Sequence, residues 1–596
     1  MSHQTRADLL KQAFTLTDLS GSGWSLEACL MEIADDLFEY RFGLRSETER
    51  PLPRLTIEWH LPMGDAMASW APDYHHAPHL APIWCNDCRT ESDLVNWVPI
   101  GLFHNPDGIN CGAMAFSDAI RHVESFCGVS EDHCRLEFKL KLFEIPEAPC
   151  DRFDGTIRID LRRRFYAEIL SDFTRWYESF PEYRPAPVPD ACREVLYSSW
   201  YSYHQEVFAS EIYKECAAAV PYGIRSVIVD DGWQTDDNRR GYAYCGDWRI
   251  SKRRFPDFAA HVREIQKLGV RYCLWYSVPF VGCRADNYEY WKPKFLWELN
   301  PGPERFGILD PRFPEVRQFL SDTYAKAVRD WNLDGLKLDF IDGFKVWDED
   351  PAVRDNYAGR DCKNIFDAVT LLLEEVSQRL RSIRPDIMIE FRQNYVGPAI
   401  RKYGNMFRAA DCPADPLSNR IRTLKLRLTS GNTAVHSDMI EWAMDSSVEN
   451  AAYQIQNIFF SVPQISMRLE ELPPEHRRML KFQLGFWREH RDLLLDAPLT
   501  PLHPELNYPV VYAENSTEKI ALRYAPDFLI TFPAAKRRGY LVNAAGGSPV
   551  PLKLEEAPRN VRLQNVTGEV LQAPPLRSGL QMVPLPAGAL LTLEWA

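Results

Sequence analysis

The pattern of hydrophobic and polar residues changes twice along the chain. From residue 1 to about 180, apolar and polar residues alternate, as in 54–61, 134–145 and 155–161. A period of two is typical of strands that bury one face, so this zone is predicted to be β-rich. The next segment, 180–190, carries four prolines. Proline cannot continue a helix or a central strand, so we predict an interdomain linker there.

Between about 191 and 500, short apolar segments alternate with amphipathic ones. The strands are expected at 195–201, 226–233, 270–278, 335–340 and 387–393, and helices at 258–269, 314–331 and 363–383. Such alternation over some 300 residues is typical of a (β/α)₈ barrel or an open doubly wound sheet. A dinucleotide-binding sheet opens with a Gly-rich phosphate loop, but the first strand here runs into SSWYSYHQ. The pattern therefore favours the barrel.

The chain returns to short strands after residue 505, at 508–514, 519–525, 528–533, 539–544 and 589–595. Turns separate them, which predicts a small antiparallel β domain. A length of 596 residues also exceeds what one compact domain holds. We therefore predict an α/β protein with a TIM-barrel catalytic domain over 186–502. It is flanked by an N-terminal β-sandwich over 1–185 and a C-terminal β-sandwich over 503–596.

Charge and composition narrow the class of partner. The net charge is −14 and no Lys/Arg run is long, which argues against nucleic acid and anionic membranes. The N-terminus shows no signal-peptide pattern and no window has the apolar length of a membrane span, so we expect a cytoplasmic chain. An aromatic content of 12% suits stacking against sugars, although large cores use aromatics as well.

The cysteines give little support for a metal site. Cys85 and Cys88 have CxxC spacing, but a structural zinc needs a second such pair or His partners nearby. Cys111, Cys127 and Cys134 follow at irregular intervals. We therefore predict no metal and no cofactor, and the role of the CxxC pair stays open.

Acidic and aromatic residues recur at the ends of the predicted strands, where a TIM barrel carries its reactive groups. They are Asp230, Asp231 and Trp233 after the second strand; Trp275; Lys337 and Asp339; Glu390 and Arg392; and Arg408, Asp411 and Asp415 in RAADCPAD. A glycosidase needs two carboxylates, polar groups for the hydroxyls and an aromatic face. Each motif alone has a structural explanation, such as a helix cap or a Lys–Asp pair that braces the barrel.

The order of these motifs resembles that of the melibiase-type α-galactosidases, glycoside hydrolase families 27 and 36. The similar segments are IVDDGWQ (228–234), GDWRISKRRFPDF (246–258), KLGVRYCLWY (267–276), GLKLDF (335–340), RAADCPAD (408–415) and TAVHSDMI (433–440). The resemblance implies that Asp339 is the nucleophile and Asp411 the acid/base. It also implies sugar binding by Lys337 and Arg408.

The same resemblance assigns the 4- and 6-hydroxyls of galactose to Asp230 and Asp231, and it places His436 in a late barrel strand. One position departs from the family pattern: Arg392 lies where large bacterial members have a Cys- and Gly-rich loop. It is expected to narrow the pocket, to bind a different hydroxyl pattern, or to pair with a structural acid.

These observations predict a retaining exo-α-galactosidase that acts on oligosaccharides or glycosides, so the expected partner is a small carbohydrate. A general acid must be protonated, so the pKa of Asp411 is expected above the usual range. The alternatives keep the machinery and change the sugar or acceptor: an α-glucosidase, an α-N-acetylgalactosaminidase or a raffinose-synthase-like galactosyltransferase. A non-catalytic carbohydrate-binding protein is a further alternative. Homo-oligomerisation stays open.

Overall fold

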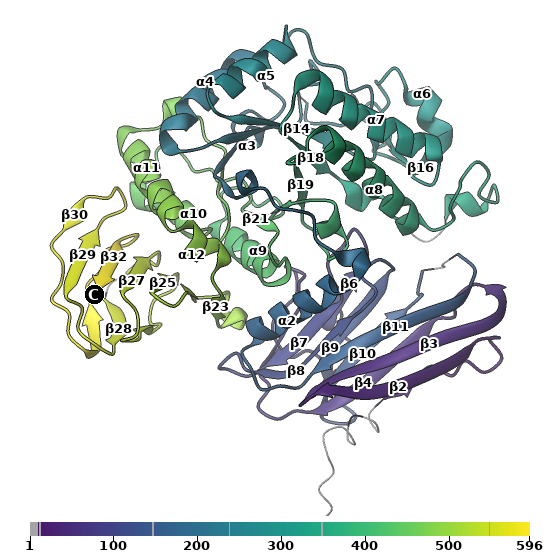
Figure 1. Ribbon diagram of the computed structural model, residues 1–596, viewed down its shortest axis with the longest axis horizontal. Helices are drawn as coiled ribbons and strands as arrows, with labels where there is room; N and C mark the ends of the chain where they lie inside the picture. Colours follow the sequence, from purple (N-terminus) through teal and green to yellow (C-terminus); the bar gives the residue numbers. More distant parts are fainter. Residues whose placement is uncertain are drawn as a thin grey trace, which may run out of the picture.

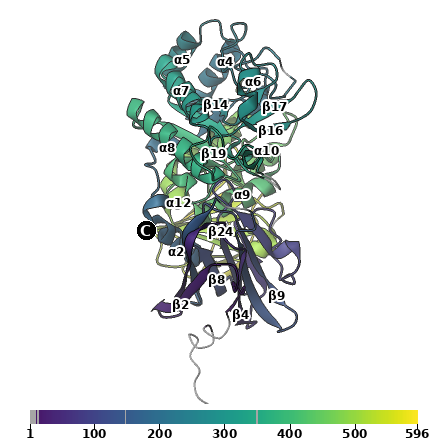
Figure 2. The ribbon, with the colours of Figure 1, turned by 90° about the vertical axis from the view of Figure 1, so that its right-hand side faces the viewer.

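The computed structural model describes residue 10 and residues 14–145, 148–237, 239–346, 350–547 and 549–595. Three parts follow one another along the chain (Figure 1): a pair of β-sheets, a barrel surrounded by helices, and a second, smaller pair of sheets. In the side view the barrel stands above the N-terminal sheets (Figure 2). The predicted fold class, a TIM barrel between two β-rich parts, is confirmed.

The N-terminal part is built from two antiparallel sheets that face each other. The five-stranded sheet has the order β1 (Thr15–Leu16), β4 (Leu55–Pro62), β10 (Arg135–Leu142), β9 (Val123–Ser130), β6 (Arg89–Ser92). The six-stranded sheet has the order β2 (Ser25–Ala34), β3 (Leu37–Arg50), β11 (Cys150–Asp160), β8 (Asn110–Phe116), β7 (Ile100–His104), β5 (Ala68–Trp70). Alternate residues such as Ile57 and Phe138 are buried between the sheets, as the period of two predicts.

Helix α2 (Tyr166–Glu178) joins this part to the barrel. Its apolar face, which includes Ile169 and Phe173, belongs to the same core as the barrel, and Tyr177 Oη donates to the carbonyl of Phe116 on β8 at 2.6 Å. The proline-rich segment that follows is packed against its surroundings. Tyr183 in it is buried, and its hydroxyl donates to the carbonyl of Ser117. The segment therefore tethers the two parts closely, and the domain limits at 185 and 502 remain predictions.

Eight parallel strands form the barrel. In chain order they are β12 (Leu196–Ser198), β13 (Ser226–Val229), β14 (Arg271–Ser277), β18 (Gly335–Asp339), β19 (Met388–Arg392), β20 (Met406–Arg408), β21 (Ala434–His436) and β22 (Gln464–Ile465). β22 pairs with β12, and a parallel bridge from His436 to Val462 closes the ring. Apolar side chains such as Leu196, Ile228 and Met388 fill the amino-terminal end of the interior, so the open end is the carboxyl one.

Helices follow the barrel strands along the chain, and most of them cover the outside of the barrel. They are α3 (Trp200–Tyr203), α4 (Ala209–Ala219), α5 (Phe258–Lys267), α7 (Pro314–Trp331), α8 (Ile365–Ile383), α9 (Pro416–Thr429), α10 (Val448–Gln456), α11 (Pro474–Glu489) and α12 (Arg491–Asp496). After β14 the chain adds a small sheet of β15 (Phe280–Gly282), β16 (Phe295–Leu299) and β17 (Phe306–Leu309), together with α6 (Tyr288–Trp291). This insertion was not predicted. No described helix is both long and apolar enough to cross a membrane.

The C-terminal part consists of a seven-stranded and a three-stranded sheet. The larger has the order β23 (Leu499–Leu502), β24 (Val510–Glu514), β25 (Glu518–Arg523), β27 (Arg538–Asn543), β32 (Leu590–Glu594), β29 (Asn560–Gln564), β30 (Val570–Leu571). The smaller has the order β26 (Ile530–Phe532), β28 (Val550–Leu554), β31 (Gly579–Val583). Most pairings are antiparallel, but β25 pairs with β27 and β26 with β28 in parallel.

Candidate active site

The register of the barrel strands gathers the polar side chains that follow them. Lys337 pairs with Trp275 on one side and Glu390 on the other, and Asp339 pairs with Ser277. Residues two apart on a strand point to the same face. Lys337 Nζ accordingly lies 3.7 Å from Asp339 Oδ2, and both side chains are buried in the barrel interior.

Asp339 is surrounded by hydrogen-bond donors. Its Oδ1 accepts from Arg392 Nε at 2.8 Å and from Tyr395 Oη at 2.6 Å, and its Oδ2 accepts from Trp275 Nε1 at 3.0 Å. Burial alone would raise the pKa of Asp339, but the charges of Arg392 and Lys337 hold it well below its usual range. Asp339 is therefore a carboxylate whose position is fixed and which stays ionised.

The bulky Arg392 thus pairs with the predicted nucleophile itself. Its guanidinium also lies over the rings of Phe340 and Tyr395, at 5.1 and 5.5 Å. Of the three roles expected for Arg392, the geometry supports the first, because the side chain occupies space beside Asp339.

Asp230 and Asp231 occupy opposite electrostatic settings. Lys337 Nζ donates to Asp230 Oδ2 at 2.7 Å. Asp231 instead accepts from two amides, Gln205 Nε2 and Gln234 Nε2, both at 2.6 Å. Burial raises the pKa of Asp231 to about 7, against the effect of these two amides. The pair therefore offers two buried carboxyl groups with different partners, an ammonium group for Asp230 and two amides for Asp231.

Asp411 lines the same pocket and is more open to solvent than Asp339. Its side chain is 53% exposed, and Arg408 Nη2 donates to its Oδ1 at 2.9 Å. Arg408 Nη1 meanwhile donates to Asp438 at 2.5 Å. Burial by itself would raise the pKa of Asp411, but the positive charges of Arg408 and Lys337 lower it. The expectation of a raised pKa is therefore wrong, because the nearby cations outweigh both burial and the charge of Asp339.

A pocket at the carboxyl end of the barrel brings eight of the twelve predicted residues together. Its lining comprises Asp230, Asp231, Trp275, Lys337, Asp339, Arg392, Arg408 and Asp411, with Trp200, Tyr242 and Phe340. Sequence reasoning missed these last three, together with Tyr395 and Asp438. The signal for Asp438 is its place two residues after His436 in the motif at 433–440.

Four predicted residues lie outside this lining. Trp233 is buried among Trp248, Phe258, Tyr276 and Trp331, and its Nε1 donates to the carbonyl of Trp275. It packs behind the strand because Gly232, at φ +116°, turns the chain; a Cβ there would meet the backbone of Gln205 at 2.6 Å.

The other three have structural partners. Asp415 is exposed and caps α9 by accepting from Ser418 N at 3.0 Å. His436 is buried, with Nε2 2.7 Å from the carbonyl of Cys192. Glu390 accepts from Gln464 Nε2 at 2.5 Å beneath the pocket. Glu390 and His436 therefore support the residues above them, and the Pro at the start of α9 was a signal that Asp415 is a cap.

The pocket is narrow. Its volume is about 40 Å³, against the roughly 300–1,000 Å³ of pockets that hold drug-sized ligands. Arg392 is 16% exposed, packs on two rings and pairs with Asp339, so it is one of the bulky groups that narrow the pocket.

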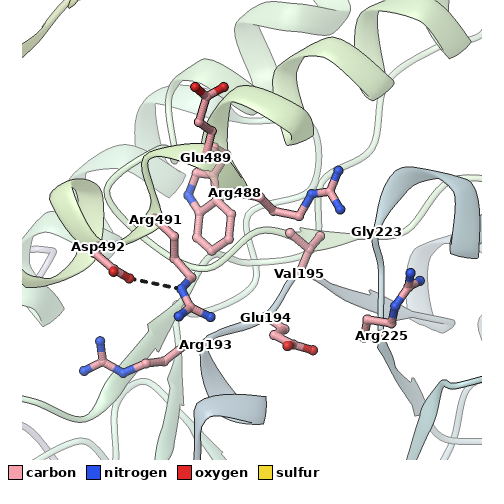
Figure 3. A pocket seen from close by; sticks show the side chains of 10 residues that line it. Arg193, Glu194, Val195, Gly223, Arg225, Arg488, Glu489, Arg491 and Asp492 are labelled. Carbon is pink, nitrogen blue, oxygen red and sulfur yellow. Dashed lines mark hydrogen bonds and ion pairs between the residues drawn. The ribbon is translucent and has the colours of Figure 1, made fainter.

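A larger hollow of about 340 Å³ lies at the other end of the barrel (Figure 3). Val195 and Arg225, which line it, precede β12 and β13, so this is the amino-terminal end of the strands. Two of its three acids are paired: Glu194 with Arg271 at 3.0 Å and Asp492 with Arg491 at 3.3 Å. Residues at this end of a TIM barrel serve stability, so the chemistry belongs to the smaller pocket.

Nothing in the described part of the chain gathers three or more His, Cys, Asp or Glu side chains as a metal site does. Cys88 is buried near Ala81 and Phe126, and its Sγ lies 3.0 Å from the carbonyl of Cys85. The role of the CxxC pair is not decided by these contacts.

The sequence of the barrel is similar to that of a known protein family. Residues 165–393 match the sequence model of the melibiase family. The match covers helix α2 and the first five strands of the barrel, β12 to β19. The matched range includes Asp230, Asp231, Lys337 and Asp339 and ends before Asp411.

Two curated α-galactosidases are similar to part of this chain. The α-galactosidase AgaA of Geobacillus stearothermophilus is 28% identical over 157 residues, and the bifunctional α-galactosidase/sucrose kinase AgaSK of Mediterraneibacter gnavus is 24% identical over 205. These alignments cover 25% and 33% of this chain, but only 21% and 20% of the relatives' own length.

Two solved structures share the fold over nearly the whole chain. The α-galactosidase of Lactobacillus brevis superposes with a TM-score of 0.65 and 14% identity, covering 96% of this chain and 80% of that one. A variant of the GH36 α-galactosidase AgaA, in complex with stachyose, gives 0.66 and 13%, covering 96% and 81%. The likeness therefore extends to the flanking β-sheets as well as to the barrel.

Proposed function

We propose that this protein is a retaining exo-α-galactosidase that removes terminal α-galactosyl residues from oligosaccharides or glycosides. The observation that carries the proposal is the pairing of a fixed, ionised Asp339 with a half-exposed Asp411 in one pocket. The family match supports the sugar class, as do solved relatives in complex with stachyose or raffinose.

In the first step, Asp339 attacks the anomeric carbon and forms a covalent β-glycosyl ester. The bond from that carbon to the leaving-group oxygen breaks, and Asp411 gives its proton to this oxygen. In the second step, Asp411 removes a proton from water, the water attacks the anomeric carbon, and Asp339 leaves as a carboxylate. The lowered pKa of Asp411 favours this second role, because a base must be ionised.

The two steps set different demands on the charges around the pocket. The cations near Asp339 favour its ionised form, so they help it to leave in the second step. For the first step Asp411 must hold a proton although Arg408 disfavours one. As pH rises and Asp411 loses its proton, activity on substrates with poor leaving groups should therefore be lost at a lower pH than activity on aryl glycosides.

Sugar recognition is assigned to the buried carboxyl groups and the aromatic wall. Asp230 and Asp231 bind hydroxyls, and Trp275 and Tyr242 form the apolar face. Arg392 occupies space next to Asp339 and donates to Oδ1 of the nucleophile. The same residue is the reason to test other sugars, since it narrows the pocket beside the reacting carbon.

A side-by-side assay tests the proposal. Purified protein is given the nitrophenyl α-galactoside, α-glucoside, α-N-acetylgalactosaminide and β-arabinopyranoside, and initial rates are compared. The α-galactoside should have the highest kcat/KM, with release of α-galactose first. Preference for another glycoside would reassign the sugar, and no turnover of any of the four would contradict the enzyme assignment.

A further inference from the structure

The segment that carries Asp411 is held from three directions. The backbone N–H of Ala410 donates to Gln393 Oε1 at 3.0 Å. The backbone N–H of Cys412 donates to Asp438 Oδ2 at 2.6 Å. Both acceptors follow barrel strands. The third holder is Arg422, whose Nη1 donates to the carbonyls of Ala410 and Asp411 at 2.9 and 2.6 Å. Arg422 lies on α9, outside the ring of strands, so its own position needs an explanation.

The N-terminal part supplies that explanation. The guanidinium of Arg422 lies over the ring of Tyr74, 4.2 Å from its centroid. Tyr74 belongs to the loop after β5 and is half-buried. A cation over an aromatic face is attracted by the ring quadrupole. Stacking on Tyr74 thus holds the plane of the guanidinium while its Nη1 remains directed at the two carbonyls.

The loop with Tyr74 is itself fixed at two places. Lys425, one turn further along α9, donates to the carbonyls of Ala71 and Asp73 at 3.0 and 2.5 Å. The ring of Tyr74 also meets Trp97 edge-on, with centroids 5.0 Å apart. Figures 1 and 2 both place α9 directly above the N-terminal sheets. The loop that carries Tyr74 is therefore held against α9 by several specific contacts.

Trp97 extends the contact to the other catalytic loop. Its backbone N donates to the carbonyl of Asn394 at 3.0 Å. That loop carries Arg392 and Tyr395, both of which bind Asp339. The N-terminal part thus contacts the loop with Arg392 and Tyr395 directly, and the Asp411 loop through Arg422.

We propose that Tyr74 and Arg422 are positioning residues for Asp411: the N-terminal β part holds the acid/base loop of the barrel through this stacked pair. The inference rests on the proposed function, because it assigns a role to Asp411. It predicts that removing the contact between Tyr74 and Arg422 slows protonation of the leaving group by Asp411. Attack by Asp339 on the anomeric carbon should be largely unaffected.

Leaving-group dependence provides the measurement. The value of kcat/KM is compared for a nitrophenyl α-galactoside, which needs little protonation, and for methyl α-galactoside, which needs Asp411. Tyr74→Ala should lower the methyl-to-nitrophenyl ratio about fivefold, which corresponds to about 1 kcal/mol. Arg422→Met, which keeps the stem and loses the donors, should lower it on the order of tenfold or more. Tyr74→Phe keeps the ring and should restore the ratio.

Tyr213→Ala is the matched control, since Tyr213 is an exposed tyrosine on α4, away from the pocket. Equal losses on both substrates, or an unchanged ratio in both variants, would overturn the positioning role. Arg422→Met alters the barrel side only, so it decides the question if Tyr74→Ala does not fold. A wild-type protein that cleaves neither galactoside would instead refute the proposed function, and this inference with it.

Discussion

Removing one hydroxyl next to the nucleophile should separate the two chemical steps. Tyr395→Phe deletes the donor that lies 2.6 Å from Asp339 Oδ1 and leaves the buried ring in place. Asp339 keeps Arg392 Nε at 2.8 Å and Trp275 Nε1 at 3.0 Å, so it stays ionised. The change therefore weakens the stabilisation of the carboxylate without removing it.

The size of the effect follows from the charge on Asp339 along the reaction. A hydrogen bond to a charged group contributes about 1.5–3 kcal/mol. In the covalent intermediate Asp339 is a neutral ester, and about half of its charge has returned in the transition state of hydrolysis. Roughly half the energy, about 0.7–1.5 kcal/mol, is then lost there, which slows hydrolysis about 3- to 13-fold. Formation of the ester should not slow, because the ionised ground state loses more than the transition state.

Rapid mixing with a nitrophenyl α-galactoside measures both steps. Tyr395→Phe should give a burst of nitrophenol followed by a slower steady state, with kcat reduced and kcat/KM maintained. Tyr324→Phe is the control, because Tyr324 Oη is buried without a hydrogen-bond partner among the described residues. If kcat and kcat/KM of Tyr395→Phe fall by the same factor and no burst appears, the reasoning about charge on Asp339 is refuted.

Further predictions concern recognition, acid assistance and pH. At pH 8, where Asp231 with its pKa of about 7 is mostly ionised, Asp231→Asn should reduce kcat/KM about ten- to a hundredfold, since a charged acceptor for a hydroxyl is worth about 1.5–3 kcal/mol; an unchanged value in a folded variant would remove Asp231 from the site. Asp411→Ala should reduce kcat/KM for methyl α-galactoside far more than for the nitrophenyl substrate, and equal losses would make Asp411 structural. Burial raises the pKa of Glu390 to about 7, so the folded state binds its proton more tightly than the unfolded state does. The contribution of Glu390 to the free energy of unfolding is complete at low pH and is lost as pH rises through about 7. Between pH 5 and 8, the free energy of unfolding of Glu390→Gln should therefore rise by up to about 3 kcal/mol relative to that of wild type. Melting curves at both pH values check this, and a difference independent of pH would count against it.

Much of the fold could be predicted because its signals are local. The alternation in 54–61 is the buried face of β4, and the run of short apolar segments gives the parallel strands of the barrel. Asp230, Lys337 and Asp339 could be found because side chains at strand ends in a barrel meet in one place. The insertion at 280–309 gave no such signal, since its three short strands depend on contacts with one another.

The rest of the site depends on directions that a sequence does not contain. Trp233 follows two predicted binding residues in the motif, yet the turn at Gly232 sends it behind the strand. Tyr242 and Tyr395 lie on loops, and only the folded chain shows that they reach the pocket and Asp339. Tyr74 is some 340 residues from Asp411, and nothing in its local sequence indicates a contact with that loop.

The central claim is that Asp339 is the nucleophile of a retaining mechanism, and a single variant tests it most directly. Asp339→Gly removes the carboxylate and leaves space beside the anomeric carbon, and circular dichroism verifies the fold. Turnover should be almost abolished, and added azide should react with nitrophenyl α-galactoside to give the β-galactosyl azide. A folded Asp339→Gly protein that keeps most of the native activity, or that yields only the α-azide, would contradict the account.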